Sequence, residues 1–241
     1  MTEPTMPGMF CRRFRAVADG SQCTAEVEDD HHHMIVRVAH DESTVVAIEG
    51  EMVRSPFDLC AGATMLLDQL IGIAIAPRVH LPSAFADKEH CTHLLDTAIL
   101  AIAQAARTGE RRYEFQVPDS VGGRTRPSIL RDGKQILSFD TVEDTITAPQ
   151  AFAGQSLRKM LPWAERTLDD DDLEAVRLLR RVMMVARGQQ AAASPGLVSP
   201  SVAAQKLGAC YTLQESRIGR ATPQENYRPL SDQPWQFTLP R

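Results

Sequence analysis

The first fifty residues carry apolar side chains at alternating positions, and this pattern most constrains the fold of the chain. A period of two is typical of strands that bury one face. The pattern is interrupted at Asp19-Gly20 and at Asp41-Glu42-Ser43, which are residues that favour turns. We therefore predict an antiparallel meander with strands at residues 10–17, 23–28, 34–39 and 44–48.

The spacing of the apolar residues changes at Ser55, from the alternation typical of strands to the spacing typical of helices. Ser55 is a suitable N-cap, Pro56 suits the first helical position, and Asp58 places a carboxylate three residues after the cap. A helix to about Ile71 should follow, with an apolar stripe that faces the sheet. A second amphipathic helix is expected over residues 91–107.

The pattern of the second half is mixed. Residues 113–117 read as a strand, and Asp132-Gly133 lies between two apolar pairs, which predicts a tight hairpin. Residues 168–188 begin with acids and end with arginines, which suits the dipole of a long helix and explains Asp169 to Asp172 as capping residues. Residues 189–201 read as a linker, and the tail should wrap the body. We expect an α+β fold, with a small antiparallel sheet covered by helices over residues 1–110 and a mixed extension over residues 111–241 packed on it as one unit.

Composition excludes several classes of function. The 241 residues are 43% hydrophobic, enough for a core without disulfides, and the net charge of -5 argues against general nucleic-acid binding. No apolar run is long enough to cross a bilayer, and the first twenty residues do not fit a signal peptide, so we expect a cytoplasmic protein that does not bind membranes. Nucleotide-binding and common hydrolase motifs are absent. The chain has five cysteines, and an odd count in a reducing compartment argues against a set of disulfides. A cysteine with a special role would therefore be a metal ligand or a nucleophile.

Candidate site residues gather at the ends of the expected elements. Cys60 and Cys91 fall at the starts of the two helices, where unpaired amides favour a thiolate, and His93 follows Cys91 in the same turn. The triplet His31-His32-His33 precedes the third expected strand. Alternation along a strand places His32 on the opposite side of the sheet from His31 and His33. Histidine at a sheet end and cysteine at two helix starts would form a tetrahedral site for zinc or another thiophilic metal. Packing of the two cysteines and a solvated strand start are the simpler alternatives, and Cys11, Cys23 and Cys210 are interpreted as small hydrophobic residues.

The segments His32-His33-Met34-Ile35-Val36-Arg37-Val38, Pro56 with Cys60, Leu70-Ile71-Gly72 and Cys91-Thr92-His93-Leu94 together resemble the bacterial family known as domain of unknown function 2889. The resemblance covers about residues 10 to 110. The family's strand motif more often reads His-Asp-Met, so His33 departs from it. This family supplies no settled activity.

A more distant resemblance is to iron-sulfur scaffold proteins of the NifU-like kind, which share a SufE/NifU-like core. The resemblance implies a zinc ion or nascent cluster at positions matched here by Cys60, His90 and Cys91. Such proteins also use a strand cysteine, and His32 or His33 occupies that region instead. Because imidazole suits zinc while cluster irons are usually held by thiolates, the change favours a stable zinc-type site.

Our leading hypothesis is a metal-dependent enzyme of lyase or hydrolase type that acts on a small organic molecule. The expected metal is zinc, with iron as the alternative. The sequence is compatible with a homo-oligomer. The alternatives are an iron-sulfur or sulfur-transfer accessory protein, an enzyme with a metal-free cysteine nucleophile activated by His93, and a non-catalytic binding module. The expected metal ligands are Cys60, Cys91, His93 and either His32 or His33, and the candidate general bases are Glu49, Glu51 and His90.

Overall fold

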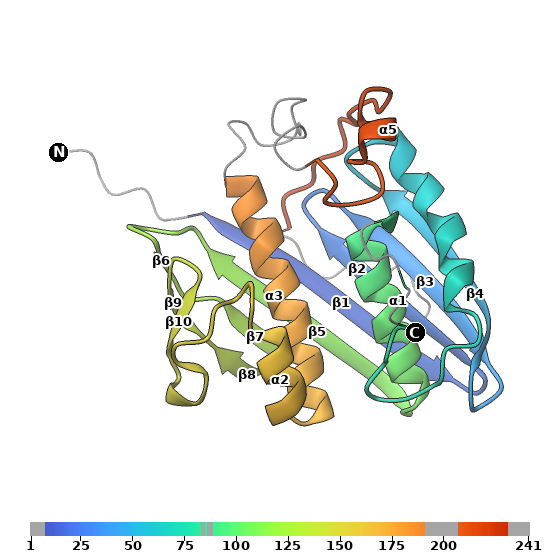
Figure 1. The fold of residues 1–241 in the computed structure, drawn as a ribbon, viewed down its shortest axis with the longest axis horizontal. Helices are drawn as coiled ribbons and strands as arrows, with labels where there is room; N and C mark the ends of the chain where they lie inside the picture. Colours follow the sequence, from blue (N-terminus) through green and yellow to red (C-terminus); the bar gives the residue numbers. More distant parts are fainter. Residues whose placement is uncertain (1–7, 83–84, 86–88, 191–206, 231–241) are drawn as a thin grey trace.

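The computed structural model describes residues 8–82, 85, 89–190 and 207–230. Its main feature is a seven-stranded antiparallel sheet with strand order β4-β3-β2-β1-β5-β7-β8 (Figure 1). A second sheet of three short strands has the order β10-β9-β6. The strands are β1 (Met9–Asp19), β2 (Gln22–Asp29), β3 (His33–His40), β4 (Val45–Arg54), β5 (Gly109–Pro118), β6 (Arg124–Thr125), β7 (Ser128–Arg131), β8 (Lys134–Ser138), β9 (Asp140–Val142) and β10 (Thr145–Ala148).

The predicted N-terminal meander is present as β1 to β4. Each strand pairs antiparallel with the next, and Gly20 makes the first turn with a positive φ of 58°, a conformation that glycine adopts without steric cost. The register of the first hairpin places Arg12 opposite Asp29. The next pair of strands places His33 opposite Glu28. These registers decide which side chains meet at the sheet end.

Helices cover one face of the main sheet (Figure 1). Helix α1 (Thr92–Ala105) packs on β1, β2 and β3, and helix α3 (Asp170–Gln190) packs on β5. The core lies between these helices and the inward side chains of the strands, which are fully or nearly fully buried. The remaining helical elements are η1 (Asp58–Leu70), η3 (Gln150–Phe152), α2 (Leu161–Thr167) and α5 (Glu215–Ile218).

The first predicted helix is a 3₁₀-helix, η1, and it begins later than expected. Ser55 does not cap it, because the Ser55 hydroxyl donates to the carbonyl of Phe57 instead. A 3₁₀-helix has three residues per turn, so side chains at i and i+3 align and the stripe that faces the sheet is narrow. Its buried residues accordingly occur as pairs three residues apart, namely Cys60 with Ala63 and Leu67 with Leu70.

Residues after 110 continue the main sheet. Strand β5 pairs with β1 along its whole length, so the sheet is larger than the small one predicted for residues 1–110. The tight hairpin predicted at Asp132-Gly133 joins β7 to β8, with positive φ at both turn residues. The long helix predicted over residues 168–188 is α3. The α+β class is therefore confirmed, with a large antiparallel sheet and several helices.

The C-terminal segment, residues 207–230, packs against the start of the fold. Asp58 N and Thr222 O share a backbone hydrogen bond of 3.1 Å, and the ring of Tyr227 lies 5.1 Å from that of His31. The amide of Leu230 donates to the carboxylate of Asp30 at 2.9 Å. The segment thus contacts the start of η1 and the loop between β2 and β3. Trp235 and Phe237 of the predicted tail lie outside the described residues.

Candidate functional site

A buried ion pair lies at the end of the sheet beneath α1. Arg12 alternates with Phe10 and Phe14 on the apolar face of β1, and its guanidinium meets Asp29 across the hairpin. Arg12 Nε donates to Asp29 Oδ2 at 2.9 Å, Nη2 contacts the same oxygen, and both side chains are fully buried. A charge on this face requires a partner because burial removes its hydration.

Asp29 also organises the loop between β2 and β3. Its Oδ1 accepts hydrogen bonds from the amides of His31 and His32, each at 2.9 Å, and contacts His32 Nδ1 at 2.8 Å. Burial opposes ionisation of Asp29, but the charges of His32 and Arg12 outweigh it and hold the pKa well below 3.8. An ionised carboxylate can only accept, so the 2.8 Å contact is a hydrogen bond donated by His32 Nδ1, and it orients the His32 ring.

His93 reaches the same point from the first turn of α1. Its ring stacks on that of His32, with centroids 4.0 Å apart and planes 24° apart. His93 Nδ1 lies 3.9 Å from Cys91 Sγ, while Nε2 is buried and has no hydrogen-bond partner within the described residues. Burial, together with the charges of His32 and Arg12, holds the pKa of His93 well below 6.5, so the imidazole is neutral and able to donate a lone pair.

Asp29, His32 and His93 therefore form one compact cluster, which we call the Asp-His-His cluster. One potential ligand atom from each lies within 4.8 Å of the other two. Carboxylate oxygen and neutral imidazole nitrogen are both ligands of zinc and other divalent metals. The hydrogen bonds to Asp29 occupy both of its oxygens, so its clearest role is to orient His32, as carboxylates beside metal-bound histidines do.

The cysteines predicted as ligands lie beside this cluster, and a third joins them. Burial raises the pKa of the Cys91 thiol, and Cys210 packs against the small apolar cluster that contains Cys60. Thr212 Oγ1 donates to Cys60 Sγ at 3.2 Å, and the amide of Tyr211 donates to the carbonyl of His90 at 3.0 Å. The C-terminal segment thus carries Cys210 to the starts of η1 and α1.

Four other predicted site residues point elsewhere. His33 faces the side of the sheet opposite α1, where its Nε2 lies 2.5 Å from Glu26 Oε1. Glu49 and Glu51 are exposed on β4, and Glu51 accepts a hydrogen bond from Arg37 at 3.0 Å. His90 stacks on Phe85, and its Nε2 lies 3.3 Å from Gln69 Oε1. The structure therefore brings none of these groups into the Asp-His-His cluster.

Sequence reasoning missed Arg12, Asp29 and the role of Cys210. The alternation of β1 contained a signal for the first two, because it places Arg12 among the inward apolar residues, where it needs an acidic partner. The spacing of Asp29 and His32 was a second signal, since a carboxylate three residues before a histidine can bond its amide and ring. No local signal pointed to Cys210, whose position depends on how the C-terminal segment packs.

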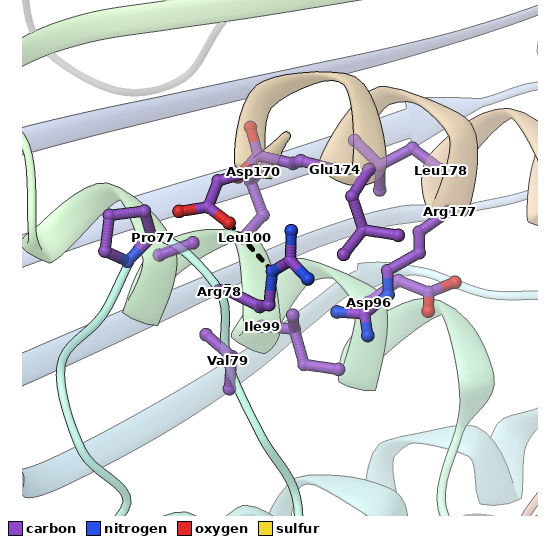
Figure 2. A pocket seen from close by; sticks show the side chains of 12 residues that line it. Pro77, Arg78, Val79, Asp96, Ile99, Leu100, Asp170, Glu174, Arg177 and Leu178 are labelled. Carbon is purple, nitrogen blue, oxygen red and sulfur yellow. Dashed lines mark hydrogen bonds and ion pairs between the residues drawn. The ribbon is translucent and has the colours of Figure 1, made fainter. Parts of the chain in front are cut away.

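A small pocket lies further along α1, between that helix and α3 (Figure 2). Arg78 crosses it and donates to Asp170 Oδ1 at 2.7 Å and to the carbonyls of Glu165 and Leu168. Asp96 lines the same pocket from α1 and pairs with Arg181 at 2.8 Å. With all three guanidinium nitrogens paired, Arg78 serves to connect α3 to the loop before α1.

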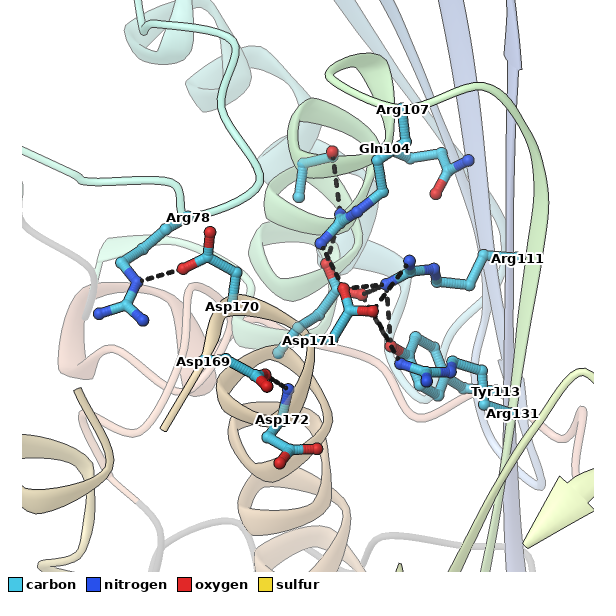
Figure 3. A network of polar contacts seen from close by, with 12 residues as sticks. Arg78, Gln104, Arg107, Arg111, Tyr113, Arg131, Asp169, Asp170, Asp171 and Asp172 are labelled. Carbon is cyan, nitrogen blue, oxygen red and sulfur yellow. Dashed lines mark hydrogen bonds and ion pairs between the residues drawn. The ribbon is translucent and has the colours of Figure 1, made fainter. Parts of the chain in front are cut away.

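The acidic run at the start of α3 has structural roles (Figure 3). Asp169 Oδ1 accepts the amide of Asp172 at 2.9 Å, as expected of a capping residue. Asp171 pairs with Arg107, Arg111 and Arg131, and so ties the helix to the turn after α1, to β5 and to β7. The run is thus explained by capping and ion pairs.

The fold and the site define an α+β protein with a buried Asp-His-His cluster between a sheet end and a helix start. Residues 13–107 match the family described as Protein of unknown function (DUF2889), which supports placing this segment in that family. That range includes all three residues of the cluster as well as Cys60 and Cys91. No curated protein matches the chain.

A solved structure, that of m157 from mouse cytomegalovirus, shows 11% identity and a TM-score of 0.21. The match covers 77% of this chain and 59% of that one, so the chain spans less than two thirds of its length. These matches do not support the NifU-like resemblance. No helix within the described residues is long and apolar enough to cross a membrane.

Proposed function

We propose that this protein is a metal-dependent enzyme that acts on a small organic molecule by hydrolase or lyase chemistry. The metal is a divalent ion, preferably zinc, bound at the Asp-His-His cluster. The observation that carries this proposal is the approach of one ligand atom each from Asp29, His32 and His93 to within 4.8 Å, where Asp29 and His32 are buried and His93 is partly buried. The neutral imidazole of His93 binds zinc without an added cost of deprotonation at neutral pH.

The contacts of the two rings support a specific division of roles. His32 Nδ1 is held by Asp29 and His93 Nδ1 faces Cys91, so the Nε2 atoms are the donors available to a metal. Their stacked planes require one ring to rotate before both lone pairs meet one ion. The cluster offers at most three protein ligands, which leaves a position for water or substrate, as in catalytic rather than structural zinc sites.

Metal analysis of the purified protein, with variants, tests the proposal. We expect about one equivalent of zinc or another divalent metal in the wild-type protein, as one cluster of this kind requires. His93→Ala and His32→Ala should lose the metal, whereas His80→Ala, which removes an exposed histidine, should retain it. A folded wild-type protein that takes up no divalent metal, even when incubated with zinc, would contradict the proposal.

A second candidate is an iron-sulfur or sulfur-transfer accessory protein, favoured by the packing of Cys210 against the apolar cluster that contains Cys60 and by the hydrogen bond from Tyr211 to His90, the residue before Cys91. Thiolates are the usual ligands of cluster irons. Anaerobic reconstitution with iron and sulfide should then give visible absorption that Cys210→Ser abolishes. Failure of the wild-type protein to develop that absorption would remove this candidate.

The metal-free cysteine nucleophile is less well supported. An activated thiol needs a lowered pKa, whereas burial raises the pKa of both Cys60 and Cys91. Alkylation of the metal-free protein by iodoacetamide at neutral pH should therefore be slower at these two sites than at a free thiol.

A further inference from the structure

One buried donor of the site has no acceptor. Arg12 is fully buried, and its Nε and Nη2 are both used by Asp29. Its third nitrogen, Nη1, has no hydrogen-bond partner within the described residues. Because nearly all buried polar groups in folded proteins are paired, an unpaired guanidinium N–H beside a candidate metal site indicates a missing acceptor.

A second guanidinium donor without a partner among the described residues lies on α3. His93 and Asp96 lie three residues apart on α1, and Asp96 pairs with Arg181 of α3 at 2.8 Å. Arg180, the next residue on α3, donates through Nη2 to the carbonyl of Arg158, and its buried Nε has no partner in the described part of the chain.

Burial raises the pKa of Asp96, while the charges of Arg181, Arg12 and Arg180 oppose that rise, so all three guanidinium groups lie within its reach. Asp29 and Asp96 face these arginines, and Asp30 adds a third carboxylate within reach of Arg12 and Asp29. A divalent metal at the cluster would add positive charge that these three carboxylates do not offset. A buried water molecule would supply an acceptor for Arg12 but would leave the charge of the metal uncompensated.

We propose that the Asp-His-His cluster binds a small oxyanion, a carboxylate or phosphate group, which accepts a hydrogen bond from Arg12 Nη1 while Arg180 adds positive charge. This inference rests on the proposed function, because the anion would be the part of the substrate that lies beside the metal. It assigns the substrate to the class of small organic acids or phosphate esters. Guanidinium groups suit both oxyanions, since their N–H donors form charge-assisted hydrogen bonds.

Calorimetric titration with three probes tests the inference: oxalate, inorganic phosphate and the neutral molecule acetamide. Zinc-loaded wild-type protein should bind at least one of the two anions and should not bind acetamide. Binding of oxalate alone identifies a carboxylate ligand, and binding of phosphate alone identifies a phosphate ligand. Arg12→Lys, which keeps the charge but loses the guanidinium geometry, should weaken anion binding by about tenfold, the usual effect of losing one charge-assisted hydrogen bond.

Two further variants keep the test decisive if Arg12→Lys does not fold. Arg180→Gln should also weaken anion binding, whereas Arg37→Gln, which removes an exposed arginine on the opposite side of the sheet, should leave it unchanged. The inference is overturned if folded wild-type protein binds neither anion, or if neither Arg12→Lys nor Arg180→Gln weakens binding. Titration of the metal-free protein separates the two proposals. Arg-dependent anion binding in a protein that takes up no metal would support this inference and contradict the metal site.

Discussion

The pair of Arg12 and Asp29 shows how a single inward arginine shapes the site. The strand pattern places its guanidinium in the core, and the hairpin register supplies the carboxylate opposite it. The same carboxylate bonds the loop amides and the ring of His32. One buried charge thereby fixes the position of a histidine that we propose as a metal ligand.

Replacement of Asp29 by Asn should strongly destabilise the protein. The change leaves Arg12 buried without its counter-charge, and breaking such a buried pair typically costs about 3–5 kcal/mol. The free energy of unfolding from urea denaturation measures the effect. Glu51→Gln is the matched control, since its half-exposed pair with Arg37 should contribute less than about 1 kcal/mol. Equal effects of the two substitutions would contradict this account.

Cys23 should make the protein sensitive to alkaline pH. Burial raises the pKa of its thiol from 9.0 to about 12 in the folded state. Between these values the unfolded chain has lost a proton that the folded protein still holds, so the free energy of unfolding falls as the pH rises. The slope for one such group approaches about 1.4 kcal/mol per pH unit.

The measurement is urea denaturation at several pH values between 9 and 12. Cys23→Ala should flatten the decline. Val38→Ala removes bulk from the residue that pairs with Cys23 across β2 and β3, and should lower stability at every pH without changing the slope. An unchanged slope in Cys23→Ala would count against the role assigned to this thiol.

At the scale of elements, the sequence predicted most of the strands and two of the long helices. The meander, the Asp132-Gly133 hairpin and α3 all follow from local signals, namely alternation, turn residues and the order of charges. The pairing of β5 with β1 could not be predicted in this way, because it joins segments about a hundred residues apart whose patterns fit many partners. The 3₁₀ winding of η1 was missed because its apolar spacing also fits an α-helix.

The candidate site was predictable in part for the same reason. His32, Cys91 and His93 lie at element ends, which local patterns reveal. The side of the sheet that each histidine faces depends on strand register, and this places His32 with His93 but turns His33 toward Glu26. Cys210 reaches the site through tertiary packing of the C-terminal segment.

Glu174 should be the main polar attachment of α3 to the sheet. It accepts hydrogen bonds from Tyr113 Oη at 2.8 Å and from Arg107 and Arg111, each at 3.1 Å. Glu174→Gln should lower the free energy of unfolding by about 2–4 kcal/mol, because it leaves buried donors with a weaker acceptor.

Glu165→Gln is the matched control for Glu174→Gln, since Glu165 makes an exposed pair with Arg177 and should change stability by less than about 1 kcal/mol. Hydrogen exchange adds a local measurement: amides of α3 should exchange faster in Glu174→Gln but not in the control. Unchanged protection of α3 would show that apolar packing alone holds the helix.

At the scale of the whole molecule, the C-terminal segment connects parts that are distant along the chain. It reaches the start of η1, the loop after β2 and the residue before Cys91. Two hydrogen bonds between Asp58 and Thr222 hold its middle, one through the backbone and one through the carboxylate of Asp58. The surroundings of the candidate site therefore depend on residues more than a hundred positions away.

Asp58→Ala should loosen the C-terminal segment. The substitution removes the acceptor for the Thr222 amide, and we expect limited proteolysis to cleave residues 207–230 faster than in the wild-type protein. Asp68→Ala, at another exposed acid of η1, should leave the cleavage rate unchanged. Equal cleavage rates in Asp58→Ala and the wild-type protein would show that other contacts suffice to hold the segment.

The central place of β1 has a consequence for folding during synthesis. One edge of β1 is paired by β2 immediately, but the other edge waits for β5, which is made only after η1 and α1. An unpaired strand edge is a template for association with other chains. Nascent chains that end before residue 109 should therefore expose the unpaired edge of β1, which can associate with other chains. Chaperones that shield such edges are expected to act on this protein before its second half leaves the ribosome.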